Sequence, residues 1–352
     1  MKPSEKWPEI LLAWFDTHKR DLPWREARPR NPYHVWISEI MLQQTRTEAV
    51  KPYFHSWMEK FPTIHDLAGA SETEVLHQWQ GLGYYSRARN IHKAARVMEE
   101  KYGSAVPENK EEIRALPGIG DYTAGAILSM AYGQKEGAID GNVLRVYARL
   151  YEIEEDILKS RGKKTIASLV EKTLPERTGD FNEALMDLGA DTCIPKAPRC
   201  GNCPLKGECL AFEKGLQEKL PVRTKKKPQL VLEAACGMIT KNGKVLLHKR
   251  PPTGMLASMW EFPMVLSENA ETSRFGLESL LQGKAEELVW KYKHIFTHRI
   301  WMMKAYTVKD CKVPRGDYHW FTPEEYKEIP LAGPHAKLAA FAEKLLREEG
   351  DF

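Results

Sequence analysis

The sequence predicts a multidomain protein in which an all-α N-terminal part is joined to an α/β C-terminal part. Up to about residue 215, apolar residues recur with the spacing of amphipathic helices. Beyond residue 230, short strand-like runs flank Lys241–Lys244, which is a hairpin signal. Residues 216–229 between the two parts are basic, and we interpret them as a linker. With 352 residues the chain can form roughly two or three domains with cores of their own.

The composition is that of an ordinary soluble protein and argues against disorder, because 42% of the residues are hydrophobic and 28% are charged. A net charge of only +4 means that any nucleic-acid surface must be a local patch. The sequence contains neither an apolar run of membrane-spanning length nor the apolar stretch of a signal peptide. We therefore expect a cytoplasmic protein that does not bind membranes.

The first helical elements are residues 5–19 and residues 34–53. Glu39 lies in the second of these helices among apolar neighbours, which indicates partial burial. Burial raises the pKa of a carboxyl group and suits it to act as a general acid. Glu39, Gln43 and Arg46 are spaced so that they share one stripe of a continuous helix. The alternative is a glutamate that is simply solvated or salt-bridged.

A glycine-rich turn lies at Gly81–Tyr84 and leads into a helix. Gly81 and Gly83 permit a sharp corner that would direct Leu82 and Tyr84 outward. Apolar or aromatic side chains of this kind fill the gap that opens when a base leaves a DNA duplex. The alternative is a capped helix start with two buried tyrosines.

A second glycine-containing turn lies within Leu116–Leu128, around which the rest of the chain is organised. Pro117 ends a short helix, Gly118 and Gly120 allow a tight turn with room for positive φ, and an apolar helix follows at 123–132. Such a turn directs bare backbone N–H groups at an anion such as a phosphate. An ordinary helix–helix connection is the alternative.

Asp140 stands directly before the amphipathic helix that begins near Val143, so it is a natural N-cap. A helix N-terminus would also keep the carboxylate ionised. A charged carboxylate near a sugar stabilises an oxocarbenium-like transition state. Glu39 and Asp140 together thus form an acid and carboxylate pair suited to glycoside chemistry, with pKa values separated by their environments.

Four cysteines lie within a short segment that is stiffened by prolines. They follow the pattern Cys193-x6-Cys200-x2-Cys203-x5-Cys209. Four thiols so close in sequence can surround one metal centre, and the clustering favours a reducing compartment. A structural zinc ion is the generic candidate for such a set.

Taken together, residues 5–215 resemble the helix-hairpin-helix superfamily of DNA glycosylases, which includes endonuclease III and the adenine DNA glycosylases of the MutY family. Residues 230–350 resemble a Nudix-type α/β domain. The resemblance implies an iron–sulfur cluster lobe formed by residues 1–28 and 136–215. It implies a six-helix barrel with the hairpin at 29–135 and a lesion-recognition domain at 230–352.

The same resemblance implies the chemistry. Lyases of the superfamily carry a nucleophilic lysine where this chain has Tyr122, and a phenol cannot form a Schiff base. Hydrolysis without strand cleavage is therefore implied, with Glu39 protonating adenine and Asp140 stabilising or bonding to the sugar C1′. Tyr122 and Asn142 are expected to form hydrogen bonds around the sugar and Asp140.

Further residues match the family's DNA-contacting positions: Arg25, Gln43, Gln44, Thr45, Leu82, Tyr84, Gly118, Gly120, Glu183, Phe296, Thr297 and His298. By resemblance, Arg25 and Glu183 lie at the flipped adenine, Gln44 probes the opposite base, and Tyr84 is an inserted wedge. The family's Phe-Ser-His loop that meets 8-oxoguanine is Phe296-Thr297-His298 here. The glutamate-rich signature of Nudix hydrolases is absent, which argues against pyrophosphate hydrolysis.

The four-cysteine spacing resembles the loop that holds a [4Fe–4S] cluster in these families, so the resemblance implies that cofactor rather than zinc. The implied partner is double-stranded DNA with adenine opposite 8-oxoguanine, bound by a monomer. Two alternatives stay open. One is a bifunctional glycosylase and lyase like endonuclease III, and the other is a non-catalytic protein that binds DNA lesions.

Overall fold

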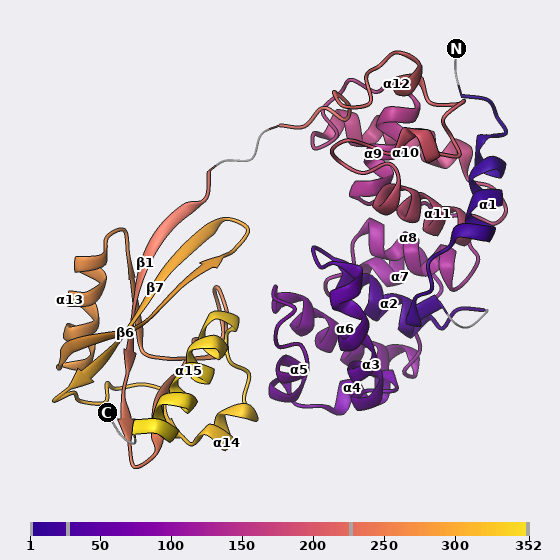
Figure 1. Cartoon of the computed structure of the whole chain (residues 1–352). Helices are drawn as coiled ribbons and strands as arrows, with labels where there is room; N and C mark the ends of the chain where they lie inside the picture. The colour runs from indigo at the N-terminus through magenta and orange to yellow at the C-terminus, as the bar shows by residue number, and fades with distance from the viewer. Residues whose placement is uncertain (1–2, 26–28, 225–227, 350–352) are drawn as a thin grey trace. The chain divides into compact units, whose positions relative to one another are not determined.

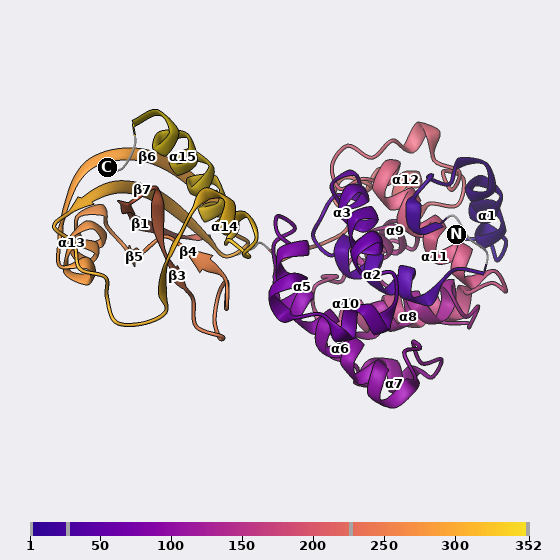
Figure 2. The same cartoon turned by 90° about the horizontal axis from the view of Figure 1, so that it is seen from below.

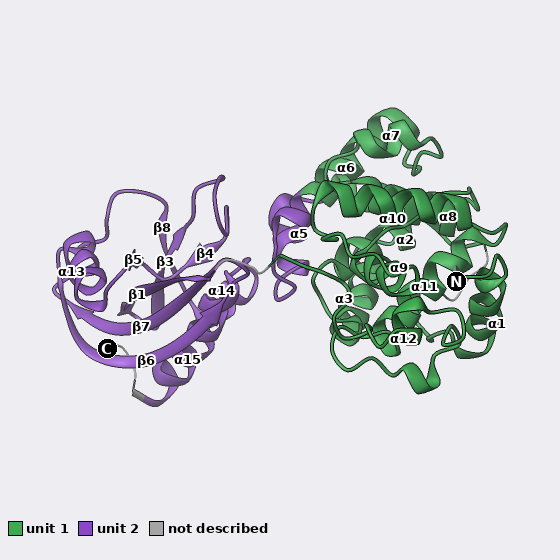
Figure 3. Ribbon diagram, turned by 90° about the horizontal axis from the view of Figure 1, so that it is seen from above, with its two compact units in different colours: residues 1–69, 90–225 green, residues 70–89, 226–352 purple. Residues whose placement is uncertain are grey.

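The computed structural model describes residues 3–25, 29–224 and 228–349. The chain forms two compact units (Figure 3). The first consists of Met1–Gly69 with Asn90–Lys225, and the second of Ala70–Arg89 with Lys226–Phe352. Lys225, Lys226 and Lys227 of the predicted linker lie outside the described residues. The finer division into a barrel and a cluster lobe stays a prediction.

The described part of the first unit consists of helices and connecting loops (Figure 1). Its α-helices are α1 (Trp7–His18), α2 (Pro32–Leu42), α3 (Thr47–Lys60), α4 (Ile64–Gly69), α6 (Ser86–Tyr102, which begins in the second unit), α7 (Lys110–Ala115), α8 (Asp121–Met130), α9 (Gly141–Leu150), α10 (Ser160–Thr173), α11 (Thr178–Asp191) and α12 (Leu210–Glu213). Short 3-10 helices lie at Pro23–Arg25 and Cys200–Asn202.

An aromatic core joins α1, α9 and α11. The indole ring of Trp7 lies with its centroid 5.6 Å from that of Tyr147 and 5.3 Å from that of Phe181, and all three side chains are almost fully buried. Buried aromatic side chains contribute large apolar areas and prefer such edge and tilted contacts. This core fixes α9 beside α11, and these two helices carry or adjoin Asp140 and Glu183.

The predicted continuous helix over 34–53 is wrong. Helix α2 ends at Leu42, and a turn separates it from α3. Gln44 adopts φ of +59°, a left-handed conformation that an α-helix cannot continue through. Glu39, Gln43 and Arg46 therefore do not share a helical stripe.

The second unit contains α5 (Glu72–Gln78) and an α/β domain (Figure 3). The strands and helices of the domain are β1 (Leu230–Met238), β2 (Thr240–Lys241), β3 (Lys244–Lys249), β4 (Trp260–Glu261), β5 (Met264–Ser267), α13 (Ala270–Leu281), β6 (Lys284–Ile295), β7 (Arg299–Lys309), β8 (Tyr318–Phe321), α14 (Pro323–Lys327) and α15 (Gly333–Glu349). The predicted hairpin is confirmed, since β2 and β3 pair through a turn in which Asn242 and Gly243 have φ of +53° and +70°.

One sheet has the strand order β5-β1-β7-β6, with β1 and β7 parallel, and a second sheet has β2-β3-β4 with β8 paired to β3. Successive residues of β1 face opposite sides of the first sheet. Ala234 and Cys236 share a core with Leu338 of α15, whereas Ala235 shares one with Leu277 of α13. The two helices thus cover opposite faces of the sheet (Figure 2). Among the described helices, none combines the length and the apolarity needed to cross a bilayer.

Candidate active site

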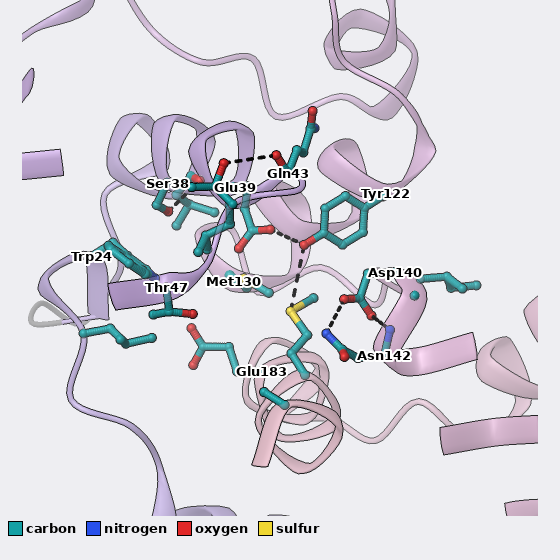
Figure 4. A pocket seen from close by; sticks show the side chains of 18 of the residues that line it. Trp24, Ser38, Glu39, Gln43, Thr47, Tyr122, Met130, Asp140, Asn142 and Glu183 are labelled. Atoms are coloured by element: carbon teal, nitrogen blue, oxygen red, sulfur yellow. Dashed lines mark hydrogen bonds between the residues drawn. The ribbon is translucent and has the colours of Figure 1, made fainter. Parts of the chain in front are cut away.

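A cavity of about 760 Å³ in the first unit collects most of the predicted N-terminal site residues (Figure 4). It is lined by residues of α2, α3, α8, α9, α10 and α11, of the 3-10 helix Pro23–Arg25 and of the connecting loops. The predicted residues among its lining are Arg25, Glu39, Gln43, Gln44, Thr45, Tyr122, Asp140, Asn142 and Glu183. The structure therefore brings together side chains that are far apart in the sequence.

Glu39 is buried, with 5% of its surface exposed, and the hydroxyl of Tyr122 donates a hydrogen bond to its Oε2 (Figure 4). Burial raises the pKa of Glu39 to about 7, and the hydrogen bond from Tyr122 opposes the rise while the nearby Asp140 adds to it. A carboxyl group with such a pKa holds its proton in a large fraction of molecules at neutral pH. The predicted raised pKa is confirmed, whereas Tyr122 bonds to Glu39 rather than to Asp140.

Asp140 caps helix α9, as predicted. Its Oδ1 accepts hydrogen bonds from the backbone N–H groups of Asn142 and Val143, both at 2.8 Å. Its Oδ2 accepts one from Nδ2 of Asn142 at 2.7 Å. Burial raises the pKa of Asp140, and these three hydrogen bonds act against it. The helix N-terminus alone therefore does not determine its titration, because desolvation is the larger effect.

Arginines meet carboxylates at one side of the cavity. Glu183 accepts from Nη2 of Arg30 at 2.6 Å and lies 3.3 Å from Nε of Arg25. Asp187 lies one turn further along α11, and its Oδ2 accepts from Nη1 of Arg25 at 2.8 Å, while Arg20 bonds to its Oδ1. Burial alone would raise the pKa of Asp187, but the hydrogen bonds and charge of Arg25 together with Arg20 hold it below its usual range.

Sequence reasoning missed Arg20, Arg30 and Asp187. The available signal was the spacing of Asp187 four residues after Glu183 in one helix, which places both carboxylates on the same face. It also missed Lys163, an exposed lysine of α10 that lines the cavity together with Asp140.

The turn before α8 differs from the prediction in one respect. Gly118 has φ of +79°, and an added Cβ would lie 2.6 Å from Cβ of Asn90, so only glycine fits there. Gly120 has φ of −101° and needs no left-handed conformation, so that part of the prediction is wrong. A Cβ on Gly120 would meet nothing within 4 Å, which leaves open space at the N-terminus of α8.

The turn before α6 also corrects the prediction. Tyr84 points outward, with 41% of its surface exposed, but Leu82 is buried with 7% exposed. The corner directs one side chain in and the other out, and burying the leucine removes apolar surface from water. Within the second unit the hydroxyl of Tyr84 is hydrogen-bonded to that of Thr297. Phe296, beside Thr297, packs on Trp301 with ring centroids 4.8 Å apart.

The four clustered cysteines Cys193, Cys200, Cys203 and Cys209 line one small cavity together with Arg149, Pro198, Lys206 and Phe212. None of the four forms a disulfide, and Nη1 of Arg149 donates to Sγ of Cys193 at 3.3 Å. Within the described residues, no three His, Cys, Asp or Glu side chains converge closely as ligands of a metal ion. The cysteines therefore gather around a space rather than at a single point.

The chain was compared with known proteins. The family model of HhH-GPD superfamily base excision DNA repair proteins matches residues 37–172, and that of the NUDIX domain matches residues 234–340. The human adenine DNA glycosylase is 37% identical over 383 residues, covering 90% of this chain and 70% of the human protein. The one from Schizosaccharomyces pombe is 32% identical and covers 93% of this chain and 87% of that protein. The chain belongs to the adenine DNA glycosylase family.

Solved structures of DNA glycosylases and endonuclease III resemble the helical part of this chain. A thermostable thymine-DNA glycosylase is 32% identical with a TM-score of 0.54, covering 59% of this chain and 95% of that one. A trapped endonuclease III–DNA covalent intermediate is 25% identical with a TM-score of 0.50, covering 59% and 95%. The predicted family and the predicted fold class, a helical glycosylase core with a Nudix-like domain, are confirmed.

Proposed function

We propose that this protein hydrolyses the N-glycosidic bond of adenine mispaired with 8-oxoguanine or guanine in duplex DNA and leaves the strand intact. The observation that carries the proposal is that Glu39 and Asp140 line the same cavity. Glu39 accepts a hydrogen bond from Tyr122, which stands where a lyase of the superfamily would carry its lysine. The family's adenine DNA glycosylases support the adenine substrate. The reaction would begin base excision repair.

Glu39 is the proton donor. As the bond between C1′ and N9 breaks, its electron pair leaves with the base, and Glu39 protonates adenine at N7 to make it a better leaving group. The raised pKa of about 7 keeps this proton available at neutral pH. Water then adds its oxygen to C1′, and its proton returns to the Glu39 carboxylate, so that adenine and an abasic site are the products.

Asp140 meets the positive charge that develops at C1′. Three hydrogen bonds from Asn142 and Val143 fix the carboxylate, so it need not reorganise during the reaction. Burial raises the pKa of the Tyr122 hydroxyl well above its ordinary value, so the group stays neutral and donates to Glu39. Strand cleavage through a Schiff base requires an amine, which a phenol cannot replace.

Lys163 is assigned to a phosphate next to the flipped nucleotide. Arg20, Arg25 and Arg30 at the cavity pair with Glu183 or Asp187, whereas the ammonium of Lys163 has no carboxylate partner among the described residues. A lone cation on the wall that carries Asp140 is suited to the phosphate of a nucleotide whose sugar lies at that carboxylate.

The four cysteines would hold a [4Fe–4S] cluster. Four soft thiols around one space, with Phe212 and the cations Arg149 and Lys206 at its wall, fit a cluster that carries negative charge. When bound, the cluster would order the loop rather than take part in base removal. Lys196 and Arg199 are exposed on that loop and would meet DNA phosphates. Iron and acid-labile sulfide measured on purified protein test this assignment, because zinc without iron would contradict it.

Phe296, Thr297 and His298 lie between β6 and β7 and are proposed to read 8-oxoguanine. Threonine keeps the hydroxyl of the family's serine and adds a methyl group.

The cysteines form no disulfide among the described residues, which accords with the proposed cytoplasmic location, where thiols stay reduced.

Single-turnover base release from a short duplex with adenine opposite 8-oxoguanine tests the function, with an adenine–thymine duplex as control. We expect strand breaks only after alkali, which would report an abasic site left intact. Breaks without alkali, together with borohydride trapping of protein on DNA, would instead favour a lyase. Tight binding without any base release would favour a lesion-binding protein.

A further inference from the structure

The turn that presents Tyr84 has an unusual backbone. Gly81, Gly83 and Tyr84 all have positive φ, at +104°, +71° and +49°. Glycine adopts such angles freely, but a bulky aromatic residue does so only when its surroundings hold it there. Tyr84 is nevertheless exposed, with 41% of its surface accessible. Something in the structure must therefore hold the backbone that aims its ring outward.

Arg87, in the first turn of α6, makes the contacts that do this. It is buried, with 9% of its surface exposed. Its Nη2 donates to the carbonyl oxygens of Leu82 at 3.1 Å and Gly83 at 3.2 Å, and its backbone N–H donates to the carbonyl of Tyr84 at 2.8 Å. One side chain thus binds two consecutive carbonyls of the turn.

The plane of the same guanidinium also meets aromatic rings. Its Cζ lies 5.1 Å from the centroid of the Trp79 ring and 5.5 Å from that of Tyr84. The indole N–H of Trp79 donates to the carbonyl of Gly83 at 3.0 Å, so Trp79 holds both the arginine and the turn. Burial lowers the pKa of Arg87 to about 10, which still leaves the group charged at neutral pH.

We propose that Arg87 is a positioning residue that holds Tyr84 in its outward, left-handed conformation before DNA binds. The inference rests on the proposed function and on the wedge role that the family resemblance implies for Tyr84, whose ring would fill the space left by a flipped nucleotide. A ring already in place loses little conformational freedom on insertion, so base flipping is faster. Lysine is not an equivalent of Arg87, because an ammonium lacks the flat guanidinium that lies over the rings of Trp79 and Tyr84 while Nη2 bonds to both carbonyls.

The test measures how fast 2-aminopurine opposite 8-oxoguanine unstacks, by stopped-flow fluorescence with full-length protein. Every variant carries Glu39→Gln, so that the base stays on the DNA. We expect Tyr84→Ala and Arg87→Met each to slow unstacking roughly tenfold, and the double variant to be no slower than Tyr84→Ala alone. Arg87→Lys should be as slow as Arg87→Met. Arg96→Met is the matched control in the same helix, since Arg96 makes one long hydrogen bond to the carbonyl of Ala68 at 3.4 Å.

Multiplying effects in the double variant would show that Arg87 acts independently of Tyr84 and would overturn the proposal, as would an Arg87→Met variant as fast as Arg96→Met. If Tyr84→Ala unstacks the base at the normal rate, the wedge assignment is wrong and the inference falls with it. The base-release assay on the adenine duplex would still judge the glycosylase function by itself. If Arg87→Met does not fold, Arg87→Lys takes its place in the cycle.

Discussion

Glu39 in the first unit and Glu261 in the second are both buried, with 5% and 4% of their surfaces exposed, yet their pKa values shift in opposite directions. Burial raises the pKa of Glu39 to about 7, and the hydrogen bond from the neutral phenol of Tyr122 only partly opposes that rise. Burial acts on Glu261 in the same sense. There, however, His248 and Arg250 reverse it and lower the pKa, with Nη1 of Arg250 at 2.9 and 2.7 Å from the two carboxylate oxygens.

The comparison shows that burial alone does not produce a general acid; the partner decides the result. A buried carboxylate with a guanidinium partner stays ionised and holds a structure together. A buried carboxyl group whose partner is neutral retains a proton that it can donate. The proposed proton donor therefore lies in the first unit, whereas the ion pair of Glu261 with Arg250 holds β4 to the segment that follows β3.

The largest expected effect is a difference in the rate of base release between variants of Glu39 and of Glu261. Glu39→Gln removes the transferable proton and should slow single-turnover base release by roughly a thousandfold while DNA binding is retained. Glu261→Gln, the matched change of a buried glutamate, should leave the rate per folded molecule unchanged. Base release at the normal rate by Glu39→Gln would rule out Glu39 as the proton donor.

The same two variants should move stability in opposite directions. The folded-state pKa of Glu39 is above its unfolded value, so the folded protein binds the extra proton, and stability is lost as the pH rises from about 4.5 to about 7. At about pH 8, Glu39→Gln should therefore be more stable by up to roughly 3 kcal/mol. Glu261→Gln leaves the partly buried Arg250 without its anion and should cost about 2 kcal/mol.

Urea unfolding at low and high pH measures the free energy of unfolding of both variants and of the wild type. The advantage of Glu39→Gln should disappear below the unfolded pKa, where the wild-type carboxyl is protonated in both states. A destabilised Glu39→Gln at high pH would mean that the carboxylate is compensated as well as Glu261 is, and the comparison would fail.

Removing the hydrogen-bond partner of Glu39 should shift the pKa of its carboxyl group. Tyr122→Phe removes the hydrogen bond that opposes the rise in the pKa of Glu39, so that pKa should rise further. Since the protonated form is the active one, the rate of base release should fall with increasing pH through about 7 in the wild type and at higher pH in the variant. A pH–rate profile of single-turnover base release for both proteins tests this. An unmoved alkaline limb would show that Tyr122 does not tune Glu39.

Much of this site could be predicted from the sequence, because its key residues have local signatures. Asp140 directly precedes an amphipathic helix and does cap it, and Glu39 has apolar neighbours in its helix and is buried. Partners from distant segments could not be predicted. Glu183 was expected at the base, and its ion pairs with Arg25 and Arg30 depend on how three segments pack. The end of α2 before Gln44 and the inward turn of Leu82 depend on backbone conformations that helical periodicity does not encode.

The smallest expected effect extends the comparison from the carboxylates to the cations. Arg25 is committed to Glu183 and Asp187, whereas Lys163 is exposed at the same cavity and is expected to meet a phosphate. We expect Lys163→Gln to weaken DNA binding severalfold at low salt. In a plot of the logarithm of the DNA-binding constant against the logarithm of the salt concentration, the slope should become shallower by about one. The preference between mismatches should not change. Lys164→Gln is the matched control, an exposed lysine one residue further along α10 that does not line the cavity. Equal salt slopes for the two variants would contradict a phosphate contact specific to Lys163.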